Sequence, residues 1–361
     1  MDPQQILQFP HVAAPATGTS LAIAPGLRWL RMPLPFALDH INLWLLQDGP
    51  GWTIVDCGIA TELSRNLWEQ IFAAPQEGTQ SATRVPAFQA ARVLVTHYHP
   101  DHAGLADWLC ERFGVTLWMS QADYLTVHAI RESVAGYSPD NLLRMYRSNG
   151  IGGAALEKMS LRGNHYRQVV PAFPHSYRRI MDGDEIRIGG RTWRVIMGYG
   201  HAPEHAALYC SELGTLISGD MVLPKISTNI SVSPIDPDGN PLQLFLDSLR
   251  RYAGLPNDTL VLPSHGLPFR GLHERIEQLE EHHAQRCEQL YDACERPLSA
   301  FDAIPTLFQR ELDPHQLFFA MGEAMAHMHY LFFRGALRRQ TGADGVIRYL
   351  QDRAPIKGVA T

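Results

Sequence analysis

The segment Thr96–His102 constrains this chain more than any other feature, because it places three histidines and an aspartate within six consecutive positions. It follows residues 91–95, an apolar, β-branched stretch that predicts a buried strand. In open α/β folds, active sites lie beyond the carboxyl ends of strands. Imidazole and carboxylate groups together suit zinc, iron or manganese, and so many ionisable groups in so small a space need a compensating cation. The segment therefore predicts a metal-binding loop at a strand end.

The spacing of these residues excludes the simpler zinc sites. Structural zinc sites favour cysteines paired as CxxC, and none of the five cysteines forms such a pair. An HExxH motif would place two histidines four positions apart on one helix face. His97 and His99 are two apart, a spacing at which side chains of an extended strand end point the same way. The alternative is a histidine-rich surface loop without metal, which the companion residues described below disfavour.

Composition sets wide limits on the function. The chain has 361 residues, 45% hydrophobic and 19% charged, which is typical of a globular protein with one large domain and room for a smaller appendage. Its net charge of −6 disfavours nucleic acid as a partner. The odd cysteine number indicates free thiols, and we find neither a secretory signal nor an apolar run long enough for a membrane span. We therefore expect a cytoplasmic protein without membrane contact, and the oligomeric state stays open.

Strands and helices alternate along the first half of the chain, which predicts an α/β fold. Residues 120–180 break this alternation with helical patterns around 122–133 and 140–147 and are rich in histidine and tyrosine, so we interpret them as an inserted helical cap. A polar stretch at 75–86 predicts a surface loop. The expected strands are 27–33, 41–47, 52–55, 91–95, 115–119, a hairpin within 182–196, 207–210, 214–218 and 259–262, and the expected helices of this half are 61–73 and 103–113.

The character of the sequence changes after Gly271. A helical stripe begins at Leu272, Ser299 could cap a second helix, and Asp313-Pro314 could begin a third. Two short segments around a turn then close the chain. Three helices followed by a hairpin suggest a small winged-helix-like unit. We therefore expect an N-terminal extension at 1–24, a catalytic domain at 25–270 and a C-terminal helical domain at 271–361.

Three further candidate ligands each follow a predicted strand. His201 comes after the strand that ends near Gly200, Asp220 follows 214–218, and His265 follows 259–262. A single histidine near a strand end is more often a structural residue than a ligand. Their ordered recurrence, with small residues beside each, favours ligands instead.

At this point the chain resembles the metallo-β-lactamase-fold superfamily over about residues 25–270. The motifs that carry the resemblance are Asp56-Cys57-Gly58, His97-Tyr98-His99-Pro100-Asp101-His102, Gly200-His201, Ser218-Gly219-Asp220 and Ser264-His265-Gly266. The resemblance implies an αββα sandwich with a two-metal site along one edge of the sheets. It implies His97, His99 and His201 on one divalent metal, Asp101, His102 and His265 on the other, Asp220 bridging both, and Asp56 holding the histidine loop.

The chemistry of such a site is hydrolysis. Two dications lower the pKa of a water between them and so generate hydroxide near neutral pH. Asp101 and Asp220 are the expected catalytic carboxylates, and Asp101 could pass the proton of the water to the leaving atom. An HxExD variant of the loop would suggest a di-iron redox relative, whereas His99 at that position favours hydrolysis. Zinc is the expected metal, with iron and manganese as alternatives.

Narrower features point to a thioester or another small carboxylic ester as substrate. Residues 200–205 (GHAPEH) resemble the GHTxGH stretch of thioester hydrolases, which makes His205 a candidate supporting residue. The chain lacks the C-terminal Arg/Lys cluster that glyoxalase II uses to hold glutathione, which disfavours hydroxyacylglutathione as the particular thioester. Candidate substrate-binding residues are Lys225, His165 and Tyr166.

Several alternatives stay open at this stage. A phosphodiesterase or ribonuclease of the same fold is the main one, because winged-helix-like tails occur in lactamase-like hydrolases, some of which cut single-stranded RNA. Arg334, Arg338, Arg339 and Arg348 could form a basic patch, although a solvated face is the more ordinary interpretation. A persulfide-dioxygenase-like iron enzyme and a metal-free binding protein are the other two.

Overall fold

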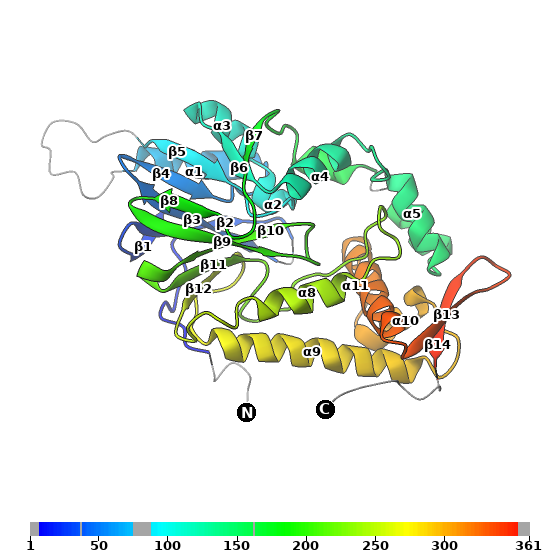
Figure 1. Ribbon diagram of the computed structural model, residues 1–361. Coiled ribbons are helices and arrows are strands. Elements are labelled where there is room, and N and C mark those ends of the chain that lie inside the picture. The colour runs from blue at the N-terminus through cyan, green and yellow to red at the C-terminus, as the bar shows by residue number, and fades with distance from the viewer. Residues whose placement is uncertain (1–6, 37, 75–87, 162, 353–361) are drawn as a thin grey trace, which may run out of the picture.

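The computed structural model describes residues 7–36, 38–74, 88–161 and 163–352, and its centre is a pair of β-sheets packed face to face (Figure 1). The predicted surface loop at 75–86 and residues 1–6 of the N-terminal extension lie outside the described residues. The first sheet has the order β1-β2-β3-β4-β5-β6-β7, antiparallel up to β4 and parallel beyond it. Its strands are β1 (Ser20–Ala24), β2 (Leu27–Pro33), β3 (His40–Asp48), β4 (Gly51–Val55), β5 (Ala90–Leu94), β6 (Leu117–Met119) and β7 (Tyr177–Arg179).

The second sheet has the order β12-β11-β10-β9-β8, and only its β11–β12 pair is parallel. Its strands are β8 (Glu185–Ile188), β9 (Arg191–Gly198), β10 (His205–Cys210), β11 (Thr215–Gly219) and β12 (Leu260–Pro263). Apolar side chains from the inner faces of both sheets form one core cluster, which includes Trp29, Trp44 and Trp193. Burial of these large side chains holds the two sheets together.

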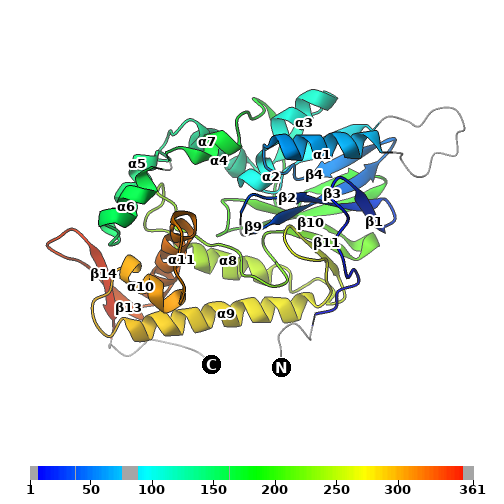
Figure 2. The same cartoon turned by 180° about the vertical axis from the view of Figure 1, so that it is seen from behind.

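Helices cover the outer faces of both sheets, which completes the expected αββα sandwich. Figures 1 and 2 show α1 (Glu62–Ala73) and α3 (Ala106–Phe113) over the first sheet, and α8 (Pro241–Arg250) and α9 (Leu272–Ala293) over the second. In α1, the buried residues Leu67, Trp68 and Ile71 share the face that contacts the sheet. The predicted fold class is thereby confirmed.

The cap segment and the C-terminal unit lie together at one end of the sandwich (Figure 1). The cap holds α4 (Gln121–Arg131), α5 (Pro139–Ser148), α6 (Gly153–Ser160) and α7 (His165–Val169). The C-terminal unit continues α9 with α10 (Ala300–Leu307), α11 (Pro314–Phe333) and the hairpin of β13 (Leu337–Thr341) and β14 (Ile347–Gln351). Ser299 caps α10 as expected, because its side chain accepts a hydrogen bond from the Asp302 amide. The order of three helices and a hairpin is confirmed, whereas its winged-helix character stays a prediction.

Some elements differ from the expectation. The helix predicted at 103–113 begins only at residue 106, as α3, and Ala103 ends a separate short helix, α2 (Pro100–Ala103). The two are separated where the Leu105 amide donates to the Gly58 carbonyl instead of to a helical partner. The sequence analysis also missed β1, α6, α7, β7 and α8. The domain division at residues 270 and 271 stays a prediction, and one core cluster includes side chains from both sides of it. Within the described ranges, no helix combines the length and apolar character that a membrane crossing requires.

Candidate metal centre

The seven candidate ligands come from the strand ends of both sheets. The loop after β5 carries His97 and His99, and Pro100 then begins α2, whose single turn carries Asp101 and His102. Proline suits this first helical position because its missing amide hydrogen would have no helical partner. The other three candidates, His201, Asp220 and His265, follow β9, β11 and β12 of the second sheet. The sandwich therefore brings one loop of the first sheet against three of the second.

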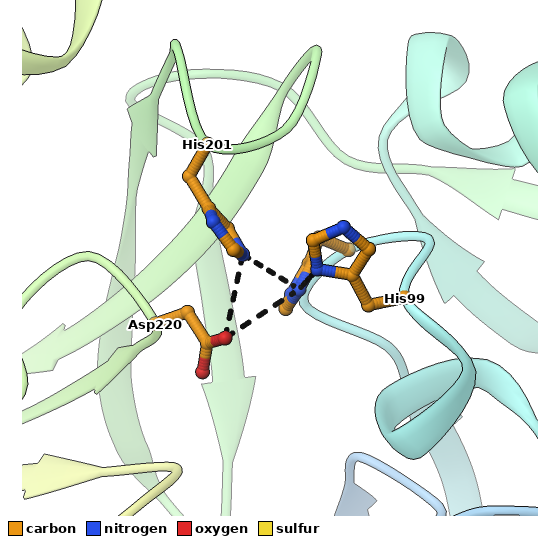
Figure 3. Close-up of side chains that lie close together, drawn as sticks. His99, His201 and Asp220 are labelled. Atoms are coloured by element: carbon orange, nitrogen blue, oxygen red, sulfur yellow. Dashed lines mark hydrogen bonds and ion pairs between the residues drawn. The ribbon is translucent and has the colours of Figure 1, made fainter. Parts of the chain in front are cut away.

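The first group of ligand atoms belongs to His97, His99, His201 and Asp220. His97 Nε2 lies 2.9 Å from His99 Nδ1 and 3.1 Å from His201 Nε2. His201 Nε2 lies 3.3 Å from Asp220 Oδ2. Figure 3 shows the side chains of His99, His201 and Asp220 pointing toward one another. These spacings match a tetrahedral site, in which ligand atoms at bonds of about 2.1 Å are about 3.4 Å apart.

The second group comprises Asp101, His102 and His265. Asp101 Oδ2 lies 3.7 Å from His102 Nε2 and 3.5 Å from His265 Nε2. Asp220 joins this group through its other oxygen, because Oδ1 lies 3.5 Å from His102 Nε2 and 3.4 Å from His265 Nε2. The two carboxylate oxygens of Asp220 therefore face different groups, which is the arrangement of a bridging ligand.

The ring nitrogens of these histidines are oriented by hydrogen bonds on their far sides. His102 Nδ1 donates to Asp56 Oδ2 at 2.8 Å, His201 Nδ1 to the Asn229 carbonyl at 2.7 Å and His265 Nδ1 to the His40 carbonyl at 2.7 Å. In the neutral form, each of these rings carries its hydrogen on Nδ1, so its Nε2 presents a lone pair to the centre. Outer partners of this kind fix the tautomer of metal-binding histidines.

The donor set fits two divalent cations. His102 Nε2 and Asp220 Oδ1 are buried and have no hydrogen-bond partner in the part of the chain that the structure describes. Buried acceptors without a partner are costly, and converging lone pairs cannot satisfy one another. Cations bound by both groups would remove this cost. Imidazole and carboxylate ligands are compatible with zinc, iron and manganese, so the donor set leaves the identity of the metal open.

Burial and charge adjust the protonation of the ligands. Burial, reinforced by the neighbouring histidines, lowers the pKa of His97 and of His99 well below the usual value, so both rings are neutral and able to bind metal. Burial opposes ionisation of Asp220, but His265 and His102 outweigh it and hold the pKa of this carboxyl well below its usual range. Burial also opposes the charge on His102 and His265, but the neighbouring carboxylates outweigh it and raise the pKa of both rings. His97 and His99 are therefore in the form that binds a cation, and a cation in the second group would replace a proton on His102 and on His265.

Asp56 and His205, the two predicted supporting residues, each form a hydrogen bond with a candidate ligand. Asp56, in a left-handed conformation with φ of 61°, accepts hydrogen bonds from the Thr96 amide and hydroxyl as well as from His102. His205 Nε2 accepts from the Asp220 amide at 3.0 Å, and burial lowers the pKa of this ring to about 3. A Cβ atom at Gly219, whose φ is +55°, would lie 2.3 Å from His205 Nε2. Glycine at this position therefore lets Asp220 and His205 approach.

Sequence reasoning missed several supporting groups. It could not identify the backbone carbonyls of His40 and Asn229 as partners of His265 and His201, because every residue has a backbone carbonyl. It also missed Asp123, a fully buried carboxylate that accepts from the Tyr98 amide at 2.9 Å and the Glu204 amide at 2.7 Å. Asp123 thereby connects the loop after β5, which carries His97 and His99, to the loop after β9. Burial raises its pKa to about 6.

The positions of the three candidate substrate-binding residues do not test their predicted role. Lys225 is exposed on the segment after Asp220, and His165 is half-buried in α7. The Tyr166 hydroxyl donates to the backbone oxygen of Tyr98, so this side chain braces the histidine loop. The substrate-binding roles of Lys225, His165 and Tyr166 stay predictions.

Replacing Asp56 with asparagine is expected to lower metal affinity or activity by about 10–100-fold. The amide group would set a donor against His102 or Thr96, which both donate to Asp56, and so would favour the wrong tautomer of His102. The measurement is the zinc dissociation constant by chelator competition, with Asp247→Asn, at an exposed position of α8, as the matched control. An unchanged dissociation constant in a folded Asp56→Asn protein would contradict the orienting role.

Fold and site together define a metal-dependent hydrolase class, and comparison with known proteins agrees. The family model described as the metallo-beta-lactamase superfamily matches residues 37–265, and a model for the metallo-beta-lactamase-like C-terminal domain matches residues 287–352. The chain therefore belongs to the metallo-beta-lactamase superfamily.

Three similar proteins illustrate this membership. A beta-lactamase domain protein from Burkholderia ambifaria is 49% identical, with a TM-score of 0.89 over 98% of this chain and 100% of that one. The probable metallo-hydrolase YqjP of Bacillus subtilis is 27% identical over 309 residues, which are 84% of this chain and 91% of the relative. The acyl-coenzyme A thioesterase MBLAC2 of Bos taurus is 22% identical over 202 residues, 56% of this chain and 65% of the relative.

Proposed function

We propose that this chain is a binuclear metal-dependent hydrolase, with zinc as the metal, that cleaves a thioester or another small carboxylic ester. One observation carries the proposal. The two oxygens of Asp220 face the two ligand groups separately, Oδ2 toward His201 at 3.3 Å and Oδ1 toward His265 at 3.4 Å. A carboxylate shared between two groups of imidazoles suits a pair of dications better than a single ion.

The residues of the site would divide the work of hydrolysis. Two bound dications would supply an acidified water and polarise the scissile carbonyl. His97, His99 and His201 would hold one ion, and His102, His265 and Asp101 the other. The Asp101 carboxyl, 17% exposed, is the acid–base group that could carry the proton of the water to the leaving sulfur. The balance is then one water consumed, one carbon–sulfur bond broken, and a carboxylic acid and a thiol formed.

Two features support a thioester over other carbonyl substrates. The GHAPEH stretch at 200–205 resembles that of thioester hydrolases, and its two histidines lie at the centre, His201 as a candidate ligand and His205 against Asp220. A bovine relative is named an acyl-coenzyme A thioesterase, although the match spans only part of each chain. A small molecule is thus the proposed partner.

The phosphodiesterase or ribonuclease alternative gains nothing from the proposed basic patch. Arg339 donates to Asp238 at 2.6 Å, and Arg348 forms two bonds to Asp344. Both cations are therefore partly neutralised. The metal content of the protein tests the persulfide-dioxygenase-like alternative. The cytoplasmic location is a separate prediction, which cell fractionation would test.

The test is a turnover screen of the zinc-, iron- and manganese-loaded protein against acyl-thioesters, lactones, β-lactams and bis-nitrophenyl phosphate. We expect about two metal ions per chain and the fastest turnover on an acyl-thioester. Hydrolysis of phosphodiesters alone, inhibited by short RNA, would replace the proposal with its alternative. A single iron with oxygen consumption on persulfides would remove the hydrolase assignment.

A further inference from the structure

The segment of residues 221–232, named here the 221–232 loop, touches two of the candidate metal ligands. It begins directly after Asp220, whose carboxylate faces both groups of ligand atoms. Farther along, the Thr228 hydroxyl and the Asn229 carbonyl lie 2.9 Å and 2.7 Å from His201 Nδ1. The path of this loop therefore determines how Asp220 and His201 are presented.

Helix α9 holds the first half of the 221–232 loop. The Arg275 guanidinium donates from Nε to the Leu223 carbonyl at 2.6 Å and from Nη2 to the Ile226 carbonyl at 3.0 Å. Arg275 is only 6% exposed, and burial lowers its pKa to about 10. Because burying a guanidinium is costly, two bonds to loop carbonyls indicate a specific fastening. About two turns further along α9, His282 Nε2 lies 3.3 Å from the Ser227 hydroxyl.

Helix α11 supports the second half of the loop by direct contact. A Cβ atom at Gly322 would lie 2.2 Å from Ser231 Oγ and 2.6 Å from Ser231 Cβ, so only glycine fits against this residue. Ser231 Oγ in turn accepts from Asn229 Nδ2 at 2.9 Å. The carbonyl of the same Asn229 orients His201. A continuous path of contacts therefore runs from α11 to a candidate ligand.

Both helices belong to the C-terminal part of the chain. Figure 2 shows α9 running from beneath the second sheet to the hairpin of β13 and β14, with α11 standing between α9 and the cap. The C-terminal unit thus reaches the metal centre through the backbone of the 221–232 loop.

We propose that α9 and α11 position the metal centre, with Arg275 and Gly322 as positioning residues that fix the 221–232 loop and so the geometry of Asp220 and His201. This inference rests on the proposed metal centre. Neither residue would touch the substrate or the metals. The C-terminal unit would then be required for tight metal binding and not only for substrate selection.

The first test uses Gly322→Ala in the full-length protein. The added methyl group must displace Ser231, so we expect the zinc dissociation constant to rise about 10–100-fold, as for other outer residues of metal sites. With cobalt in place of zinc, the visible absorption of the bound cobalt should shift, which reports a changed ligand geometry. Adding Ser231→Gly removes the colliding atoms and should restore at least part of the affinity and the spectrum.

The second test compares two arginines of α9. Arg275→Met removes both bonds to the 221–232 loop and should weaken zinc binding and lower kcat more than it raises KM. Arg286→Met is the matched control, because Arg286 donates to the Leu307 carbonyl of α10 and not to the loop. It should reduce thermal stability while leaving the zinc dissociation constant and the cobalt spectrum unchanged.

The outcomes separate this inference from the proposed function. Wild-type protein that binds no metal would remove both. Wild-type protein that binds two metals, with Gly322→Ala and Arg275→Met folded and unchanged in metal affinity and cobalt spectrum, would overturn the positioning role alone. Weaker metal binding in Arg286→Met to the same degree as in Arg275→Met would also overturn it, because general destabilisation would then explain the effect.

Discussion

Asp220→Asn is expected to lower turnover by about three orders of magnitude or more while the protein stays folded. An amide can offer one metal its oxygen, but its nitrogen cannot bind the second. The substitution also removes the negative charge that lies near His102, His201 and His265. We therefore expect one tightly bound zinc per chain in place of two, measured by metal analysis together with kcat on the substrate that the screen identifies.

The control for this prediction is Asp247→Asn, an exposed carboxylate on α8 that pairs with Arg250. It should leave both metal content and turnover unchanged. The shape of Asp220→Asn is nearly that of the wild type, so circular dichroism should show the same fold. Two tightly bound metals and near wild-type turnover in Asp220→Asn would sink the bridging role.

Removal of the metals with a chelator is the second change with a large expected effect. Turnover should vanish, because the residues of the site by themselves supply no nucleophile, and return when zinc is added back. Stability should fall as well, since each ion present at about 100 times its dissociation constant contributes about 2.7 kcal/mol. In a chain of this size, that corresponds to a loss of several degrees in Tm.

The measurement is thermal unfolding of metal-loaded and chelated protein, followed in parallel with turnover. Asp220→Asn provides an internal comparison, because it should lose less Tm on chelation than the wild type does. Unchanged Tm and turnover in protein stripped to below about 0.1 metal per chain would show that the ligand groups have another purpose.

Much of the fold could be predicted because the patterns that mark its strands and helices lie within short stretches of sequence. Periods of two and of 3.6 residues mark most strands and helices, and turn residues separate them. Some of the elements that the sequence analysis missed also have local causes. Strand β1 has a mixed pattern of exposure, and α7 has only five residues, so neither produces a clear period. The late start of α3 has a non-local cause, because the bond from the Leu105 amide to the Gly58 carbonyl joins residues distant in sequence.

The convergence of the candidate ligands could also be predicted from the sequence, because each candidate stands just after a strand and strand ends of packed sheets meet at one edge. The groups that orient these candidate ligands could not be predicted from the sequence. His265 is oriented by a carbonyl 225 positions away, and the 221–232 loop is held by Arg275 and Gly322 from helices whose sequence patterns indicate only packing.

The sequence by itself therefore indicated an α/β fold and which histidines and aspartates could bind metal, because periodicity and the order of strand-end motifs are local properties. The αββα arrangement followed from the resemblance of these motifs to those of a known superfamily. Only the tertiary structure decided which nitrogen of each ring faces the centre, that the two oxygens of Asp220 face different groups, and that α9 and α11 reach the 221–232 loop. These features depend on hydrogen bonds and contacts between distant segments, and such contacts leave no periodic trace in the chain.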